Sequence, residues 1–247
     1  MNQIRVGVFG ANGKMGQEVV RAVGRTPGMT AVGGVDLGDP LETVGRAQVV
    51  VDFTTPAAVM EHIQWCLQRG IHMVVGTTGF NEERFARVRE LCQAHPGAGV
   101  LIASNFSIGA RLMMRFSEMA ARFYPSAEIV ELHHPGKVDA PSGTSKTTAR
   151  KIAAARAEAN LGPVPDATEI DEGARGALAD GIRVHAVRLQ GLVAHQEVLF
   201  GGQGETLTIR HDSFDRVSFM PGVIAAIRHV LDHPGLTMGI DEILGLK

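Results

Sequence analysis

The chain is short of cysteine, of net charge and of long apolar runs, and each shortage excludes a class of protein. Among 247 residues, Cys66 and Cys92 form neither a disulfide framework nor a zinc-binding pattern, so we expect free thiols in a cytoplasmic protein. A formal net charge of -2 argues against nucleic-acid binding through a globally basic surface. No apolar run approaches the ~18 residues of a membrane span, and the first residues lack the pattern of a signal peptide.

The first part of the chain alternates between strand-like and helix-like segments. We expect strands at 4–9, 29–36, 48–54, 72–79 and 99–107, and helices around Met15 to Val23 and at 56–70 and 81–95. The segment at 48–54 is a nearly continuous apolar run, as in strands that are buried on both faces. This alternation predicts βαβ units, right-handed crossovers and a parallel sheet.

The pattern changes after Phe106, which indicates a second domain. Helices are expected at 108–124, 142–159 and 220–233, and a strand at 126–134. Residues 182–213 read as two or three strands joined by tight glycine turns, which predicts antiparallel pairing. Residues 161–181 are irregular and predict a long surface loop. The fold class is therefore α/β, with an N-terminal Rossmann-type parallel sheet and a smaller α+β domain that contains a mixed or antiparallel sheet.

The first strand-to-helix turn is G-x-x-G-x-x-G, spanning Gly10 to Gly16. Gly10 and Gly13 would let the backbone approach a pyrophosphate at the helix N-terminus, and Gly16 would allow close helix packing. Asp36 follows at about the 20-residue offset of a ribose-binding acid. Its carboxylate favours NADH, although Lys14 could reach a 2′-phosphate and leaves NADPH possible. The competing interpretation is a structural glycine turn without a ligand.

Three further segments, 52–56, 76–79 and 103–106, follow expected strands of the same sheet. Ligands of open parallel sheets bind outside the carboxyl ends of the strands. Each segment taken alone could be a turn without function. Together they outline one cleft for a nicotinamide.

The stretch ELHHPGKVDAPSGT, residues 131–144, suggests a metal site, a polar loop or a reaction centre. Side chains of adjacent residues in a strand point to opposite faces, so His133 and His134 are poor joint metal ligands. A solvated loop remains an alternative. Chemically, the histidines and Lys137 form a cationic pocket with possible proton donors. Free N–H groups of a helix that begins after Ser142 would hold another carboxylate. These features suggest a small dicarboxylate that accepts a hydride.

The motif E-L-H-H-x-x-K-x-D-A-P-S-G-T closely resembles the signature of the dihydrodipicolinate reductase family, also called 4-hydroxy-tetrahydrodipicolinate reductases. The segments VGVFGANGKMG, VVDFTTP, VVGTTGF, IASNFSIGA and GETLTIRHDSFDRVSFMPGV resemble the family in the same order. The resemblance covers essentially the whole chain.

The resemblance implies a role for individual residues. His133 and Lys137 match the family's proton-transferring residues, and His134, Gly143 and Thr144 match its substrate-carboxylate contacts. The segments that match the cofactor-binding residues are Gly10, Ala11, Asn12, Gly13, Lys14 and Met15, then Asp36, then Gly76, Thr77 and Thr78, then Ala103, Ser104, Asn105 and Phe106.

The resemblance also implies an activity and an architecture. The enzyme would use NADH or NADPH to reduce a cyclic dicarboxylate to tetrahydrodipicolinate, on the route to diaminopimelate and lysine. Our hypothesis is hydride transfer to ring C4, followed by protonation by the His133/Lys137 cluster. A dinucleotide-binding domain of residues 1–106 would be completed by 216–247, and residues 107–215 would bind substrate and build a homotetramer. Two rivals remain, a reductase or dehydrogenase of amino or imino acids and a nucleotide-sensing regulator.

Overall fold

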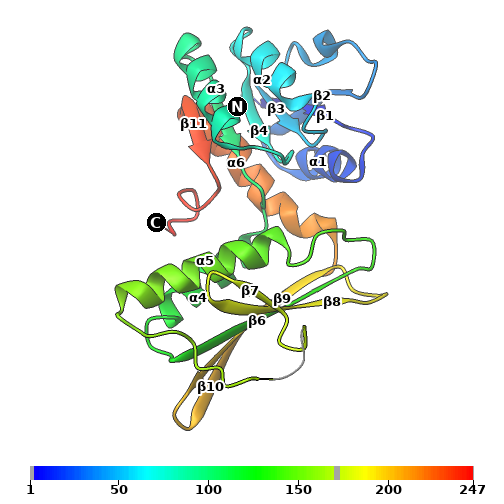
Figure 1. Cartoon of the computed structure of the whole chain (residues 1–247). Helices are drawn as coiled ribbons and strands as arrows, with labels where there is room; N and C mark the ends of the chain where they lie inside the picture. The colour runs from blue at the N-terminus through cyan, green and yellow to red at the C-terminus, as the bar shows by residue number, and fades with distance from the viewer. Residues whose placement is uncertain (1–2, 170–172, 247) are drawn as a thin grey trace. The chain divides into compact units, whose positions relative to one another are not determined.

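The structure, a computed structural model, describes residues 3–169 and 173–246. It divides into two compact units, which are described separately below (Figure 1). The first unit comprises Met1–Ile108 and Arg216–Lys247, and the second comprises Gly109–Asp215. The chain therefore leaves the first unit once and returns to it.

Six parallel strands form the sheet of the first unit, in the order β11-β5-β4-β3-β1-β2. Their bounds are β1 Ile4–Phe9, β2 Met29–Val35, β3 Val49–Asp52, β4 His72–Val75, β5 Gly99–Ile102 and β11 Gly235–Met238. The predicted parallel sheet is confirmed. Strand β11 was not predicted from the sequence, and it adds to the edge of the sheet beside β5.

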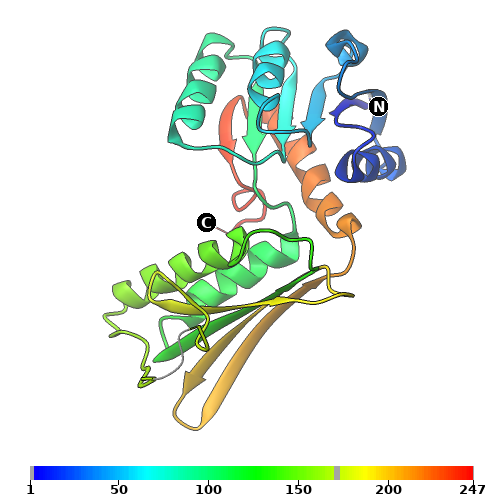
Figure 2. The ribbon, with the colours of Figure 1, turned by 45° about the vertical axis from the view of Figure 1, so that its right-hand side comes forward.

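Helices cover both faces of this sheet (Figure 2). Helices α2 (Val59–Leu67) and α3 (Glu82–Ala94) pack on one face, and α1 (Lys14–Arg25) and α6 (Met220–Asp232) pack on the other. Alternation along β3 explains the apolar run. Val50 packs in the core beneath α2 and α3, while Val49 and Val51 pack in the core beneath α1 and α6. Short 3-10 helices lie at Leu41–Val44 and Arg216–Phe219.

The second unit contains a mixed sheet in the order β10-β9-β6-β8-β7, with both long helices on one face (Figure 2). The strands are β6 Ser126–His133, β7 Ala177–Ala179, β8 Ile182–Arg188, β9 Ala194–Gly202 and β10 Glu205–Ser213, and the helices are α4 Ile108–Ala120 and α5 Gly143–Glu158. Alternate residues of β6, including Ala127 and Ile129, pack beneath α5 with Ile152. This arrangement confirms the predicted second, mixed sheet.

Two details of the second unit differ from the sequence prediction. Strands β8 and β9 do not pair with each other, because β6 lies between them and pairs with β8 in parallel and with β9 antiparallel. Only β9 and β10 form the expected hairpin. The stretch 161–181 is not entirely a loop, because β7 pairs antiparallel with β8 at the sheet edge; residues 170–172 of that stretch lie outside the described residues.

Within the described residues, none of the helices is long and apolar enough to span a membrane.

Candidate functional site

The turn between β1 and α1 depends on its glycines. Gly10 has a φ of 75°, a left-handed conformation that favours glycine, and its N–H donates to the carbonyl of Val35. A Cβ on Gly16 would lie 2.0 Å from the carbonyl oxygen of Gly10. The third glycine therefore allows the close helix-to-turn packing that the sequence predicts.

The N-terminus of α1 is open to an anion. Gly13 occupies the N-cap position with extended backbone and no side-chain cap, and the first turn carries no acidic residue. Lys14 is exposed there, while Met15 is half-buried against the core. Uncapped N–H groups and the positive end of the helix dipole favour a negatively charged group. The chain's own geometry therefore fits a dinucleotide phosphate.

Asp36 lies directly against this turn. The main-chain N–H of Asn12 donates to both of its carboxylate oxygens, at 3.0 and 3.2 Å. A Cβ on Gly34 would lie 2.5 Å from the Cβ of Ala11, so the end of β2 also approaches the turn closely. The structure thus brings together the glycine turn and the predicted ribose-binding acid.

The loop after β4 is built around the buried carboxylate of Asp52, the first residue of the predicted cleft segment 52–56. Asp52 is fully buried and accepts a 2.7 Å hydrogen bond from the hydroxyl of Thr77. The same oxygen accepts from the N–H and hydroxyl of Thr54, and the other meets Nδ1 of His62 at 2.7 Å. A Cβ on Gly76 would collide with the ring of Phe53, at 2.0 Å. The hydroxyl of Thr77 is therefore occupied within the protein.

The segment after β5 lies beside the β4 loop. The N–H of Ala103 donates to the carbonyl of Val75 at 3.0 Å, and the buried ring of Phe106 packs edge-on against Phe53. Asn105 accepts from the N–H of Ser107 through its side chain. Ser104 is exposed, whereas Ala103 and Phe106 are buried, so only part of the predicted segment presents side chains at the surface.

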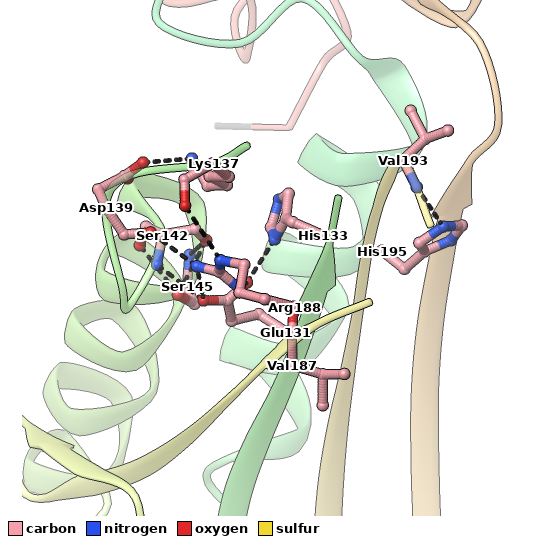
Figure 3. Close-up of polar contacts among 10 residues, drawn as sticks. All are labelled: Glu131, His133, Lys137, Asp139, Ser142, Ser145, Val187, Arg188, Val193 and His195. Atoms are coloured by element: carbon pink, nitrogen blue, oxygen red, sulfur yellow. Dashed lines mark hydrogen bonds and ion pairs between the residues drawn. The ribbon is translucent and has the colours of Figure 1, made fainter. Parts of the chain in front are cut away.

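In the second unit, His133 is the last residue of β6, and Lys137 lies in the turn that follows the strand (Figure 3). Nδ1 of His133 contacts the carboxylate of Glu131, which is fully buried. Nζ of Lys137 lies 2.6 Å from Oδ1 of Asp139. The side chains of His133 and Lys137 are 14% and 22% exposed, so both proton-carrying groups remain accessible.

Burial lowers the pKa of His133. The contact with Glu131 acts in the opposite direction, and the cationic charges of Lys137 and Arg188 lower the pKa further. His133 is therefore mainly neutral at pH 7. The hydrogen bond from Lys137 lowers the pKa of Asp139, so that carboxylate stays ionised beside the ammonium group.

The remaining predicted residues lie beyond the end of β6. The chain turns after His134, because the N–H of Lys137 donates to the His134 carbonyl, and His134 is exposed. Ser142 caps α5 by accepting a 3.1 Å hydrogen bond from the N–H of Ser145. Gly143 and Thr144 form the first turn of α5, and a Cβ on Gly143 would meet open space. The helix start predicted for this motif is therefore present.

Arg188, from β8, was not predicted as part of this cluster. Its guanidinium donates to both oxygens of Glu131 at 2.9 Å, and also to the carbonyls of Lys137 and Asp139. Glu131 is the first residue of the motif, but no role was predicted for it. Arg188 lies 57 residues from Glu131, and only the parallel pairing of β6 with β8 brings them together. Among the described residues, no group of His, Cys, Asp and Glu could hold a metal ion.

A doubly wound parallel sheet with a glycine-rich first turn, and a second unit with a histidine–lysine cluster, define the architecture of a two-domain dinucleotide-dependent oxidoreductase. Residues 4–106 match the family model "Dihydrodipicolinate reductase, N-terminus", and residues 109–244 match "Dihydrodipicolinate reductase, C-terminus". The chain belongs to the dihydrodipicolinate reductase family.

Individual relatives agree with the family match. The chain is 61% identical over 245 residues to the 4-hydroxy-tetrahydrodipicolinate reductase of Cutibacterium acnes, covering 99% of this chain and 100% of the relative. The enzyme of that name from Streptomyces griseus is 56% identical over 250 residues, with 100% of both chains covered. A dipicolinate-bound dihydrodipicolinate reductase from Paenisporosarcina sp. TG-14 superposes with a TM-score of 0.84 at 41% identity, covering 98% of this chain and 99% of that one.

Proposed function

We propose that this chain reduces 4-hydroxy-tetrahydrodipicolinate to tetrahydrodipicolinate with NADH or NADPH, on the route to diaminopimelate and lysine. The observation that carries the proposal is the grouping of His133, His134 and Lys137 next to the N-terminus of α5. Cationic side chains and the N–H groups of a helix N-terminus thus lie in one unit, and both bind anions, which suits a substrate with two carboxylates. A relative of the same fold is a reductase bound to dipicolinate.

The first unit would hold the dinucleotide. The uncapped N-terminus of α1 would bind its phosphates, with Gly10 to Met15 forming the turn. Asp36 would accept hydrogen bonds from a ribose diol, which favours NADH. The ends of β4 and β5, namely 76–78 and 103–106, would line the nicotinamide side. When bound, the reduced nicotinamide supplies the hydride.

The second unit would supply the proton and bind the carboxylates. Lys137, whose Nζ lies 2.6 Å from Oδ1 of Asp139, would be the proton donor, while the mainly neutral His133 would accept or relay a proton. His134 would bind one ring carboxylate. The main-chain N–H groups of Gly143 and Thr144, with the Thr144 hydroxyl, would bind the other. Donors that face the ring would also stabilise negative charge developing during the reaction.

A coupled assay tests the proposed reaction. The protein is mixed with aspartate semialdehyde, pyruvate and the upstream synthase, and consumption of NADH and NADPH is followed in separate cuvettes. We expect consumption that depends on both the synthase and this protein. If neither cofactor is consumed while the synthase is active, the proposed reaction is wrong.

We also propose a homotetramer built through the sheet of the second unit. The two helices pack on one face of that sheet. On the other face, Leu199 is 37% exposed, and it is paired with Thr208, which is also exposed. Sedimentation of the protein tests this proposal. A single monomeric species at micromolar concentration would contradict it.

The cysteines support a cytoplasmic location. Cys66 and Cys92 are free and buried. Burial raises the pKa of Cys92 to about 11, so both the burial and the low thiolate population keep this side chain unreactive. Fractionation of the native organism would test the location.

A further inference from the structure

Glu131 is a fully buried carboxylate on β6 surrounded by donors. Oε1 accepts from Nη2 of Arg188 at 2.9 Å and from the N–H of Ser142 at 3.3 Å. Oε2 accepts from Nη1 of Arg188 at 2.9 Å and contacts Nδ1 of His133. The guanidinium donates to both oxygens, which is the paired geometry that arginine adopts with an ionised carboxylate.

The state of Glu131 fixes the tautomer of His133. An ionised carboxylate can only accept hydrogen bonds, so Nδ1 of His133 must carry a proton and donate it to Oε2. In the neutral ring the other nitrogen, Nε2, then has the lone pair. Gain or loss of a proton by His133 is therefore confined to Nε2.

Arg188 links this carboxylate to the loop that carries Lys137. Besides its two bonds to Glu131, its guanidinium donates to the carbonyls of Lys137, Asp139 and Val187 (Figure 3). These contacts and those to Glu131 employ all five N–H donors of an arginine. Arg188 therefore has no donor left for a substrate carboxylate, and its action must pass through the groups it holds.

We propose that Glu131 and Arg188 form a positioning pair for both proton-carrying groups of the site. Glu131 holds His133 in the Nδ1–H tautomer with Nε2 free to exchange a proton, and Arg188 fixes the carbonyls on either side of Val138, including that of Lys137. This inference rests on the proposed function for its catalytic consequence, whereas the tautomer is a property of the protein alone. Neither residue belongs to the predicted site.

The tautomer is measured by ring ¹⁵N NMR, with the His133 signals assigned from a His133→Asn spectrum. We expect a protonated Nδ1 and an unprotonated Nε2 in the neutral ring of the unsubstituted protein. In E131Q the amide oxygen should take the Oε1 position, where it accepts from both Arg188 and the N–H of Ser142, so the amide NH₂ faces Nδ1, to which it can only donate. The neutral ring should then shift to the Nε2–H form. Loss of the carboxylate should also move the His133 titration to lower pH, with Lys137 and Arg188 as the remaining neighbouring charges.

The kinetic readout separates positioning from substrate binding. We expect E131Q to lower kcat by about 10²–10⁴-fold, the range for general acid–base catalysis, of which a carboxylate that fixes a catalytic imidazole reaches the upper end, with KM for the substrate changed less than threefold. R188K should also lower kcat, because an ammonium has three donors and cannot replace the planar fork. The matched control is E118Q, which removes a carboxylate paired with Arg115 and Lys151 in the same unit. It should leave both the tautomer and kcat unchanged.

An Nε2–H tautomer in the unsubstituted protein would overturn the inference, even if E131Q fails to fold. So would an E131Q variant that folds with the tautomer and kcat unchanged. Failure of the proposed function would look different, because the unsubstituted protein would then consume neither cofactor in the coupled assay while the NMR result stood.

Discussion

The main-chain N–H of Asn12 donates to both carboxylate oxygens of Asp36, so the acid after β2 is already directed at the turn before α1. In the proposed dinucleotide site, this carboxylate would face the ribose or a 2′-phosphate. The charge on Asp36 should therefore govern the choice between NADH and NADPH.

Asp36→Asn keeps the size of the side chain and removes its charge. We expect the ratio of kcat/KM for NADPH to that for NADH to rise by about tenfold, which corresponds to ~1.4 kcal/mol, because the repulsion of a 2′-phosphate is lost. The two ratios are compared in the coupled assay. An unchanged ratio would mean that Asp36 does not contact the ribose.

Gly16→Ala should destabilise the first unit. The added Cβ would lie 2.0 Å from the Gly10 carbonyl oxygen, so we expect a loss of about 1–3 kcal/mol in the free energy of unfolding. Gly24→Ala is the matched control in the same helix, because a Cβ there meets nothing within 4 Å. The control should gain roughly 0.5–1 kcal/mol. Urea unfolding of both variants measures the difference, and equal stabilities would contradict the packing argument.

Thr77→Val should cost about 1–3 kcal/mol of unfolding free energy, because the substitution leaves the buried Asp52 without one of its donors. Thr77→Ser keeps the hydroxyl and should cost less than half as much. Thermal and urea unfolding provide the measurement. If valine and serine are equally tolerated, the hydroxyl does not support Asp52.

Lys137→Ala should lower kcat by about 10²-fold or more, while the Kd for NADH is unchanged, because the ammonium belongs to the second unit and the predicted dinucleotide contacts to the first. Lys151→Ala removes another paired lysine of the second unit and serves as the control. Stopped-flow fluorescence of NADH gives the affinity separately from turnover. Full activity in the Lys137 variant would exclude it as the proton donor.

Asp166 should make the second unit sensitive to acid. Hydrogen bonds from Thr168, with the charge of Arg175 and a hydrogen bond from Arg183, lower the pKa of Asp166 to about 2 from its ordinary value of 3.8. Because the pKa is lower in the folded state, this stabilisation is complete above pH 3.8 and is lost as the pH falls toward 2. Melting temperatures of the unsubstituted protein and Asp166→Asn should therefore converge between pH 4 and pH 2. A constant difference would contradict the assignment.

The parallel sheet and the candidate site in residues 131–144 could be predicted because both leave a pattern in residues that are close together in the sequence. The alternation of Val49, Val50 and Val51 between two cores is visible in the sequence as an apolar run. Strand β11 was missed because its sequence, GLTM, lacks the buried apolar run that marks the equally short strands β3, β4 and β5. The predicted antiparallel pairing of β8 with β9 was wrong because β6 lies between the two strands, and no local sequence pattern indicates this strand order.

The candidate site divides in the same way. His133, Lys137 and the start of α5 lie within one short motif, so their grouping could be predicted. Arg188 could not be predicted, because its contact with Glu131 depends on the register in which Glu131 pairs with Ala186 and His133 pairs with Arg188. The occupation of the Thr77 hydroxyl by Asp52 likewise follows from two strand ends that meet only in the folded sheet.

The return of the chain to the first unit has a consequence for biosynthesis. The second unit is one continuous segment, Gly109–Asp215, and every strand of its sheet is translated before α6 and β11. The first unit lacks α6, one of the two helices on one sheet face, and the edge strand β11 until translation reaches Met238. Domains usually finish folding in the order of synthesis, N-terminal first. In this chain the second unit is complete in sequence before the first, and a chain that ends at residue 215 would hold all of the second unit but an incomplete first unit.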